Sequence, residues 1–124
     1  NGVHRKTLEF TKGLIALRRS TDAFRLGSES LVNTNVKLIQ SPDIGGVDTV
    51  IAYSCRSTDG ETYYVFINGD SKRRKIRLDE DLRKGTVLVD SDEAGVTPVA
   101  KVSGVRVTAN AITIDPLTVV IIKK

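Results

Sequence analysis

One strongly helical stretch, residues 4–19, opens the chain, and the apolar pattern then changes its period. Phe10, Leu14 and Leu17 are separated by four and three residues, so they share one face of a helix, and Leu8, Thr11 and Ile15 are expected to run alongside them in one wide stripe. Largely basic residues cover most of the remaining surface. Gly13 costs a helix about 1 kcal/mol relative to Ala, which indicates a close-packed neighbour there. Beyond the next turn the period is two almost to the last residue. A single amphipathic helix followed by strands predicts a boundary where one structural unit ends and a β-domain begins.

The remainder of the chain predicts about eight short antiparallel strands. Turn chemistry separates them at Ser41–Asp43, Gly45-Gly46, Ser57–Gly60, Asn68-Gly69 and Asp115-Pro116. No helical pattern interrupts the strands, which argues against a parallel sheet. The predicted fold class is therefore mainly β, an antiparallel β-sandwich of about eight strands preceded by one amphipathic α-helix. The segments with strand-like patterns are 36–39, 49–56, 62–67, 72–78, 86–89, 99–102, 105–107, 111–114 and 117–122.

The final apolar run, Val119–Ile122, consists of four consecutive β-branched residues. A strand places two of them on each face, so both faces need apolar or covered surroundings. We therefore predict a strand that is paired on both sides. One of its faces is expected in the core between the sheets, and the other under the N-terminal helix or a neighbouring domain.

Size and composition exclude several classes of protein. A chain of 124 residues suits one domain with part of a neighbour. Cys55 is the only cysteine, so the chain can form neither an internal disulfide nor a Cys/His zinc site. No apolar run approaches the roughly 20 residues of a membrane span. The net charge of +4 makes anionic partners, including nucleic acid, worth considering.

Two runs at the predicted boundary carry a family resemblance. Gly13–Arg19 reads Gly-Leu-Ile-Ala-Leu-Arg-Arg, and Ala23–Gly27 reads Ala-Phe-Arg-Leu-Gly. They resemble the last barrel helix of pullulanase-type debranching enzymes of the α-amylase superfamily, and the turn that follows it. The stretches 50–53, 64–68 and 112–120 look like the C-terminal β-domain of the same family.

The resemblance implies a division of the chain and a role for it. Residues 1–27 would be the last helix of a catalytic barrel with its connecting turn, and residues 28–124 the C-terminal β-sandwich. The parent enzyme would hydrolyse α-1,6-glucosidic branches in pullulan, starch or glycogen, and this domain would cap and stabilise the catalytic (β/α)8 barrel. The partner would be that barrel, packed through the 4–19 helix and part of the sandwich. The 4–19 helix would pack on its own β-domain, on the barrel, or on both through different faces.

The resemblance also implies what this chain does not carry. Such enzymes use an aspartate nucleophile and a glutamate acid/base at the ends of barrel strands, and no position here matches those motifs. We therefore assign no catalytic, cofactor-binding or metal-binding residue and no enzymatic activity to this chain alone. The resemblance implies no cofactor in this chain, and it allows a bound calcium ion in the parent enzyme. An extracellular or cell-surface location is expected, with the cytoplasm as the alternative.

The chain contains four candidate sites that are single reactive residues or acidic runs. His4 is the only histidine, at a terminus where no catalytic arrangement is expected, and Cys55 is interpreted as a small buried apolar residue. Asp79-Glu80-Asp81 and Asp90-Ser91-Asp92-Glu93 could offer oxygen ligands to calcium, but neither has EF-hand spacing, so solvated turns are favoured.

Two binding functions remain as alternatives. The densest basic cluster consists of Arg73, Arg74, Lys75 and Arg77. It could bind phosphate groups in a stand-alone basic domain, or it could be the charged face of an edge strand. We expect no nucleic-acid partner, because few aromatic residues accompany this basic cluster. A starch- or glycan-binding module would need exposed aromatic rings, yet the chain has no Trp. Tyr63 and Tyr64 are adjacent on a strand and so point to opposite faces, with one of them expected in the core.

Overall fold

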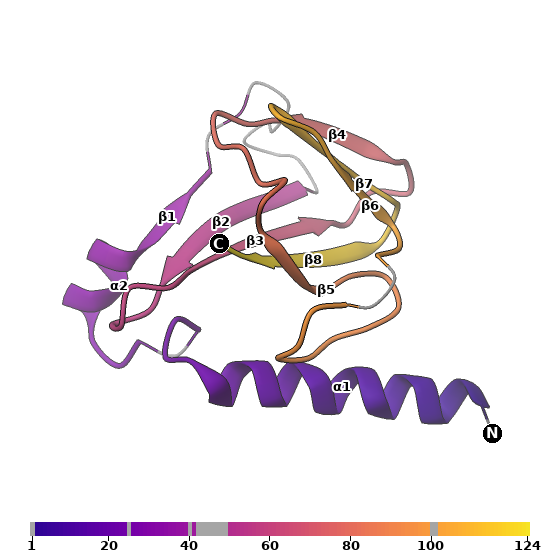
Figure 1. The fold of residues 1–124 in the computed structure, drawn as a ribbon, viewed down its shortest axis with the longest axis horizontal. Coiled ribbons are helices and arrows are strands. Elements are labelled where there is room, and N and C mark those ends of the chain that lie inside the picture. Colours follow the sequence, from indigo (N-terminus) through magenta and orange to yellow (C-terminus); the bar gives the residue numbers. More distant parts are fainter. Residues whose placement is uncertain (1, 25, 40, 42–49, 100–101) are drawn as a thin grey trace.

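The computed structural model describes residues 2–24, 26–39, 41, 50–99 and 102–124, with side chains from residue 5 onward. In this part of the chain two helices and eight strands form the fold (Figure 1). The predicted class, mainly β and antiparallel, is confirmed. The elements are α1 (Gly2–Ser20), α2 (Glu29–Asn35), β1 (Val36–Leu38), β2 (Val50–Arg56), β3 (Thr62–Asn68), β4 (Arg74–Arg77), β5 (Thr86–Val89), β6 (Val105–Val107), β7 (Ala111–Ile114) and β8 (Thr118–Lys123).

The strands form two antiparallel sheets. The larger sheet has the order β1-β2-β3-β8-β5, and the smaller one the order β4-β7-β6. Figure 1 shows the smaller sheet above the larger one and α1 lying along the opposite side of the larger sheet. The larger sheet is therefore the middle layer of a three-layer arrangement.

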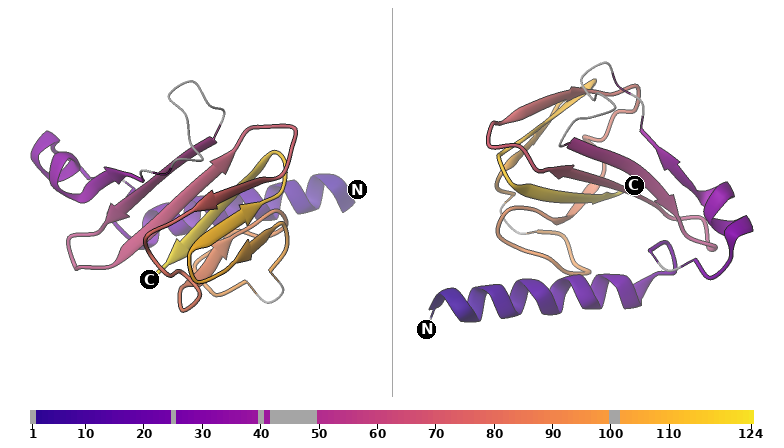
Figure 2. Two further views of the ribbon diagram at one scale, coloured as in Figure 1. Left: turned by 90° about the horizontal axis from the view of Figure 1, so that it is seen from above. Right: turned by 180° about the vertical axis from the view of Figure 1, so that it is seen from behind.

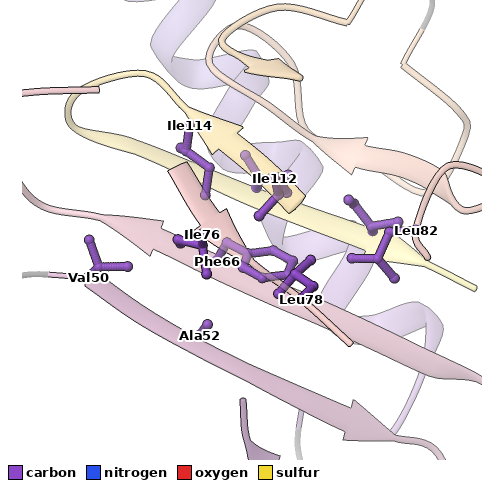
Figure 3. Packing of buried hydrophobic residues seen from close by; sticks show 10 residues of the cluster. Val50, Ala52, Phe66, Ile76, Leu78, Leu82, Ile112 and Ile114 are labelled. Carbon is purple, nitrogen blue, oxygen red and sulfur yellow. The ribbon is translucent and has the colours of Figure 1, made fainter. Parts of the chain in front are cut away.

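The main core fills the space between the two sheets (Figure 3). Phe66 of β3, Ile76 of β4 and Ile112 of β7 are fully buried there. A polar link accompanies this apolar contact, because the buried Asn68 side chain at the end of β3 donates to the carbonyl oxygen of Ile114 at 3.0 Å. The amide thus ties the larger sheet to the smaller one.

The predicted environment of the C-terminal strand is confirmed. β8 pairs with β3 on one side and with β5 on the other. Val120 and Ile122 point into the core between the sheets. Ile121 lies on the opposite face, in a second cluster that includes Leu17 of α1. One face of β8 is therefore covered by the smaller sheet and the other by the helix.

The expectation of strands alone after the first helix is wrong at residues 29–35, which form α2. Its N-cap is Ser28, whose hydroxyl accepts a hydrogen bond from the Leu31 amide at 3.2 Å, and Glu29 lies in the first turn, where the helix dipole favours an acid. These local terms stabilise one short helix before the chain becomes extended at β1.

Other strand predictions differ from the structure at their ends. Val99 and Val102, the ends of one predicted strand, lie in no strand, and residues 100–101 between them lie outside the described residues. The predicted turns at 42–46 and the start of the 49–56 strand also fall outside them. The 72–78 segment is shorter than expected, since only Arg74–Arg77 forms β4.

Candidate functional site

The inner face of α1 packs on the larger sheet. Leu17 is only 2% exposed, and Phe10 and Leu14 are half-buried against the same cluster. Their partners include Val65 of β3 and Ile121 of β8. The predicted stripe of Phe10, Leu14 and Leu17 is therefore confirmed, and the sheet of this same chain is its partner.

Two further contacts fix the ends of α1. Near its start, the Lys6 ammonium lies 2.8 Å from a carboxylate oxygen of Asp92, and this hydrogen bond lowers the pKa of that carboxyl group. Beyond its end, Asp22 accepts a hydrogen bond from the Thr58 amide at 2.9 Å, and the Phe24 ring lies 5.1 Å from that of Tyr63. The β-domain thus contacts the chain near the start of α1 and just beyond its end.

At Gly13 the backbone of α1 approaches the backbone of the β-domain closely. A Cβ atom added there would lie 1.7 Å from the carbonyl oxygen of Ala94, well inside van der Waals contact. The predicted close neighbour of this helical glycine is therefore confirmed. A side chain larger than hydrogen has no room at this position, which accounts for a glycine in a helix despite its roughly 1 kcal/mol lower helix propensity.

We expect Gly13→Ala to destabilise the chain by about 1–3 kcal/mol, although alanine is the better helix former, because the added methyl group overlaps backbone that cannot rotate away. Urea unfolding followed by circular dichroism measures the change. Ala16, an exposed residue on the same helix, offers the matched control Ala16→Gly, which should cost only the propensity term of about 1 kcal/mol. A Gly13→Ala variant as stable as the parent chain would contradict the close contact.

The prediction that Leu8 and Ile15 run alongside Phe10, Leu14 and Leu17 is wrong, because both side chains are exposed on the outer face of α1. Leu8 is 53% exposed and Ile15 49% exposed. The residues are seven apart and so share a face, and at about 100° per residue this face lies opposite the inner stripe. We call Leu8 and Ile15 the outer stripe. α1 therefore presents apolar surface on two sides, of which the β-domain covers one.

The structure places the two adjacent tyrosines on opposite faces of β3, as predicted. Tyr63 is buried in the helix-side cluster, and Tyr64 packs against the core between the sheets. The chain's other aromatic residues, Phe10, Phe24, Phe66 and Tyr53, are also described, and all six side chains are buried or half-buried. They offer no exposed flat platform of the kind that sugar rings stack on.

The expectation of a solvated turn is wrong at Asp90, and both acidic runs make hydrogen bonds within the fold. Asp90 is buried, and its two carboxylate oxygens accept hydrogen bonds from the amides of Asp92, Glu93 and Ser103, each at 2.8 Å. In the other run, hydrogen bonds from the Arg83 side chain and amide lower the pKa of Asp81 to about 2. Among the described residues no group of three or more metal-ligating side chains converges.

The basic cluster lies along the edge of the smaller sheet, because β4 is an outer strand there. Arg73 pairs with Asp115 at 3.0 Å, and Arg74 pairs with Asp70 at 3.2 Å. Lys75 and Arg77 are exposed. This arrangement favours the interpretation of a charged edge strand, which discourages pairing between molecules.

The remaining single-residue candidates give no site. Cys55 is buried on β2, as predicted, and burial raises the pKa of its thiol, which opposes formation of a reactive thiolate. His4 belongs to α1, but its side chain lies outside the described part of the chain. Neither described helix has the combination of length and apolar character needed to cross a membrane.

Comparison with known proteins gives a consistent set of matches. Residues 35–124 match a family described as SpuA C-terminal. Pullulanase A of Streptococcus pneumoniae is 38% identical over 95% of this chain, and the match spans only 10% of that protein. The chain thus covers about a tenth of the length of the curated relatives it matches.

Solved structures match nearly the whole chain. The pullulanase SAP of Group B Streptococcus has a TM-score of 0.89 and 43% identity over 97% of this chain and 16% of its own. The catalytic module of SpuA, described as a multi-modular glycogen-degrading pneumococcal virulence factor, has a TM-score of 0.88 and 38% identity, over 96% of this chain and 18% of its own. A pullulanase from Bacillus acidopullulyticus, at 14% identity and a TM-score of 0.76, shares the fold.

These matches and the helix-plus-sandwich fold define the class of protein, the C-terminal β-domain of pullulanase-type enzymes. Within that class, the chain belongs to the SpuA C-terminal family. The sequence resemblance to pullulanase-type debranching enzymes is thereby confirmed.

Proposed function

We propose that this chain is a non-catalytic domain that caps and stabilises the catalytic barrel of a pullulanase-like glycoside hydrolase. The parent enzyme would cleave α-1,6-glucosidic branches in pullulan, starch or glycogen. The observation that carries the proposal is the pair of apolar faces on α1. One face of α1 is buried on the larger sheet. The outer stripe of Leu8 and Ile15 is exposed and could pack on the catalytic barrel.

The packing of α1 on the larger sheet supports this role, because it would couple the barrel to the β-sandwich. Residues 1–27 would belong to the barrel as its last helix and turn, and residues 28–124 would form the cap. Because Leu17 packs into the sheet and Gly13 contacts the Ala94 carbonyl, a barrel that binds the outer stripe would hold the whole domain. For α1 to unfold locally, its contacts with the β-sandwich would then have to break as well. This raises the free energy of local unfolding of α1.

The proposal extends to location and cofactors. We place the parent enzyme outside the cell or on its surface, with the cytoplasm as the alternative. The description of SpuA as a virulence factor supports the first location. No cofactor is assigned to this chain, and a calcium ion of the parent would be bound by the catalytic module. The branched α-glucan would likewise be bound by that module.

Two measurements test the proposal. The isolated chain should release no reducing ends from pullulan, because no position of its sequence matches the catalytic carboxylate motifs of that family and its 124 residues are too few for the barrel that carries them. Joined to its catalytic module, the double variant Leu8→Ser/Ile15→Ser should lower the thermal midpoint of the module by several degrees. In the isolated chain the same changes should leave the midpoint within about a degree, since both side chains are half exposed.

The matched control is Lys12→Ser, which changes an exposed side chain on the same helix without removing apolar surface. Turnover of pullulan that persists through repeated purification of the isolated chain would overturn the non-catalytic assignment. A catalytic module whose midpoint is the same with and without this domain would overturn the stabilising role.

A further inference from the structure

The helix α1 covers only part of the face of the larger sheet on which it packs. Beneath it, Val65 of β3, Ile121 of β8 and Leu88 of β5 are buried. The same face continues over β2 and β1, where Ile51 is 49% exposed and Leu38 is 73% exposed. The sheet is thus apolar beyond the edge of its helical cover.

The pairing register shows that these exposed residues belong to that face. Leu38 of β1 lies opposite Tyr53 of β2, and Ile51 lies opposite Ile67 of β3. Directly paired residues in an antiparallel sheet point to the same side. Tyr53 and Ile67 border the helix-side cluster, so Leu38 and Ile51 extend its surface. The strands twist from one edge of the sheet to the other, so that β1 and β2 turn away from the straight helix (Figure 2).

A hollow of about 250 Å³ adjoins this surface between β2, α2 and the turn that follows α1. Val32 of α2, itself 40% exposed, forms one wall, and Tyr53 forms another. The side chains of the described residues that line the hollow are apolar or aromatic: Ala23, Phe24, Leu26, Val32, Val36, Tyr53 and Cys55. We call Val32, Leu38, Ile51 and Tyr53, together with this hollow, the β1–β2 face.

We propose that the β1–β2 face is a second docking surface, covered by the catalytic module of the same polypeptide. A contiguous exposed apolar face with an apolar hollow is unusual for a free surface and typical of an interface. This inference rests on the proposed function, because it assigns a second area of contact to the same partner.

Two observations identify the catalytic module as the occupant. In the matched solved structures this fold makes up only 16–18% of the chain, so most of a large polypeptide remains to cover it. The β1–β2 face is also continuous with α1, since the chain leaves the helix through Ala23 and Phe24 and these residues line the hollow. A barrel that binds the outer stripe is therefore held next to the β1–β2 face by the covalent connection.

The test uses the polypeptide that joins this chain to its catalytic module. The double variant Leu38→Ser/Ile51→Ser removes apolar side chains from the β1–β2 face. The matched control is Leu117→Ser, which alters a leucine that is 77% exposed in the turn between β7 and β8, outside this face. The readouts are the thermal midpoint and amide hydrogen exchange in β1 and β2.

We expect the double variant to lower the midpoint of the joined polypeptide by several degrees, and the control to leave it within about a degree. In the isolated chain both variants should have small effects. The amides of β1, an edge strand, should exchange at least tenfold more slowly in the joined polypeptide than in the isolated chain, and the double variant should abolish that protection.

Equal midpoints for the double variant and the control in the joined polypeptide would overturn the inference. If the Leu8→Ser/Ile15→Ser variant still lowers the midpoint in that case, the proposed function stands and only the second surface is lost. A dimer of the isolated chain that the Leu38→Ser/Ile51→Ser variant dissociates, with no extra protection of β1 in the joined polypeptide, would assign the face to a second copy and also overturn it.

Discussion

Removal of residues 117–124 is expected to abolish cooperative folding of the domain and not merely to shorten it. This segment contains β8, which pairs with β3 and β5 and separates the two cores. Val120 and Ile122 are fully buried on one face, and Ile121 is 8% exposed on the other. Each such side chain contributes about 1.5–3 kcal/mol by burial, so together they approach the 5–15 kcal/mol stability of a typical domain.

The truncation also removes the hydrogen-bonded neighbour of two strands, since β8 lies between β3 and β5 in the larger sheet. Thermal unfolding followed by circular dichroism measures the effect. Deletion of Lys124 alone is the control, and it should preserve the transition because it removes no buried apolar side chain, only an exposed ion pair with Glu80 and hydrogen bonds to the carbonyls of Thr62 and Asp81. A truncated chain with a cooperative transition within a few degrees of the full chain would contradict the central position of β8.

The fold could be predicted from sequence where burial has a simple period. The run Val119–Ile122 is apolar on both faces, and the only arrangement that satisfies it is a strand between two covers, which the structure has. The spacing of Phe10, Leu14 and Leu17 likewise fixed one face of α1. In both cases the hydrophobic effect acts on a pattern that neighbouring residues display by themselves.

α2 could not be predicted in this way. Its seven residues are too few to display a helical period, and none of them is buried in the structure. Asparagine, threonine and valine are also indifferent helix formers. The available signals were Ser28 as a cap and Glu29 in the first turn, and both are common in ordinary turns. Short elements that lack a buried face leave little trace in the sequence.

Among the candidate sites, too, some features follow from a local sequence pattern and others do not. The opposite orientation of Tyr63 and Tyr64 follows from strand geometry and was predictable. The role of Asn68 was not, because the amide meets the Ile114 carbonyl 46 residues later in the chain. The exposure of Leu38 and Ile51 also depends on where α1 ends and on how the sheet twists. These are properties of the assembled layers, which a local pattern does not contain.

Asp90→Ala is expected to cost about 2–5 kcal/mol of stability, a large effect for a change in a loop. The Asp90 carboxylate is 1% exposed and accepts three backbone N–H groups. Without the carboxylate these three amides lose their hydrogen-bond acceptor. Each amide that stays buried without a new acceptor lowers the stability by about 1–3 kcal/mol. The same loop carries the Ala94 carbonyl that contacts Gly13 and the Asp92 carboxylate that pairs with Lys6, so the docking of α1 should loosen as well.

Asp90→Asn separates the hydrogen bonds from the volume of the side chain. One carboxylate oxygen accepts from the amides of Asp92 and Glu93, and the amide oxygen of asparagine can replace it. The other accepts from the Ser103 amide, where the asparagine NH2 group would place a donor against a donor. We therefore expect Asp90→Asn to lie between the parent chain and Asp90→Ala in urea unfolding.

Asp79→Ala provides the control for the Asp90 variants, because Asp79 is an exposed carboxylate of the other acidic run and its loss should change stability by no more than about 0.5 kcal/mol. Addition of calcium separates this interpretation from metal binding. The three amides already occupy the Asp90 carboxylate, so millimolar calcium should leave the unfolding midpoint of the parent chain unchanged. A midpoint that rises with calcium in the parent chain but not in Asp90→Asn would show that this loop binds the ion, and would contradict the hydrogen-bonded role of Asp90.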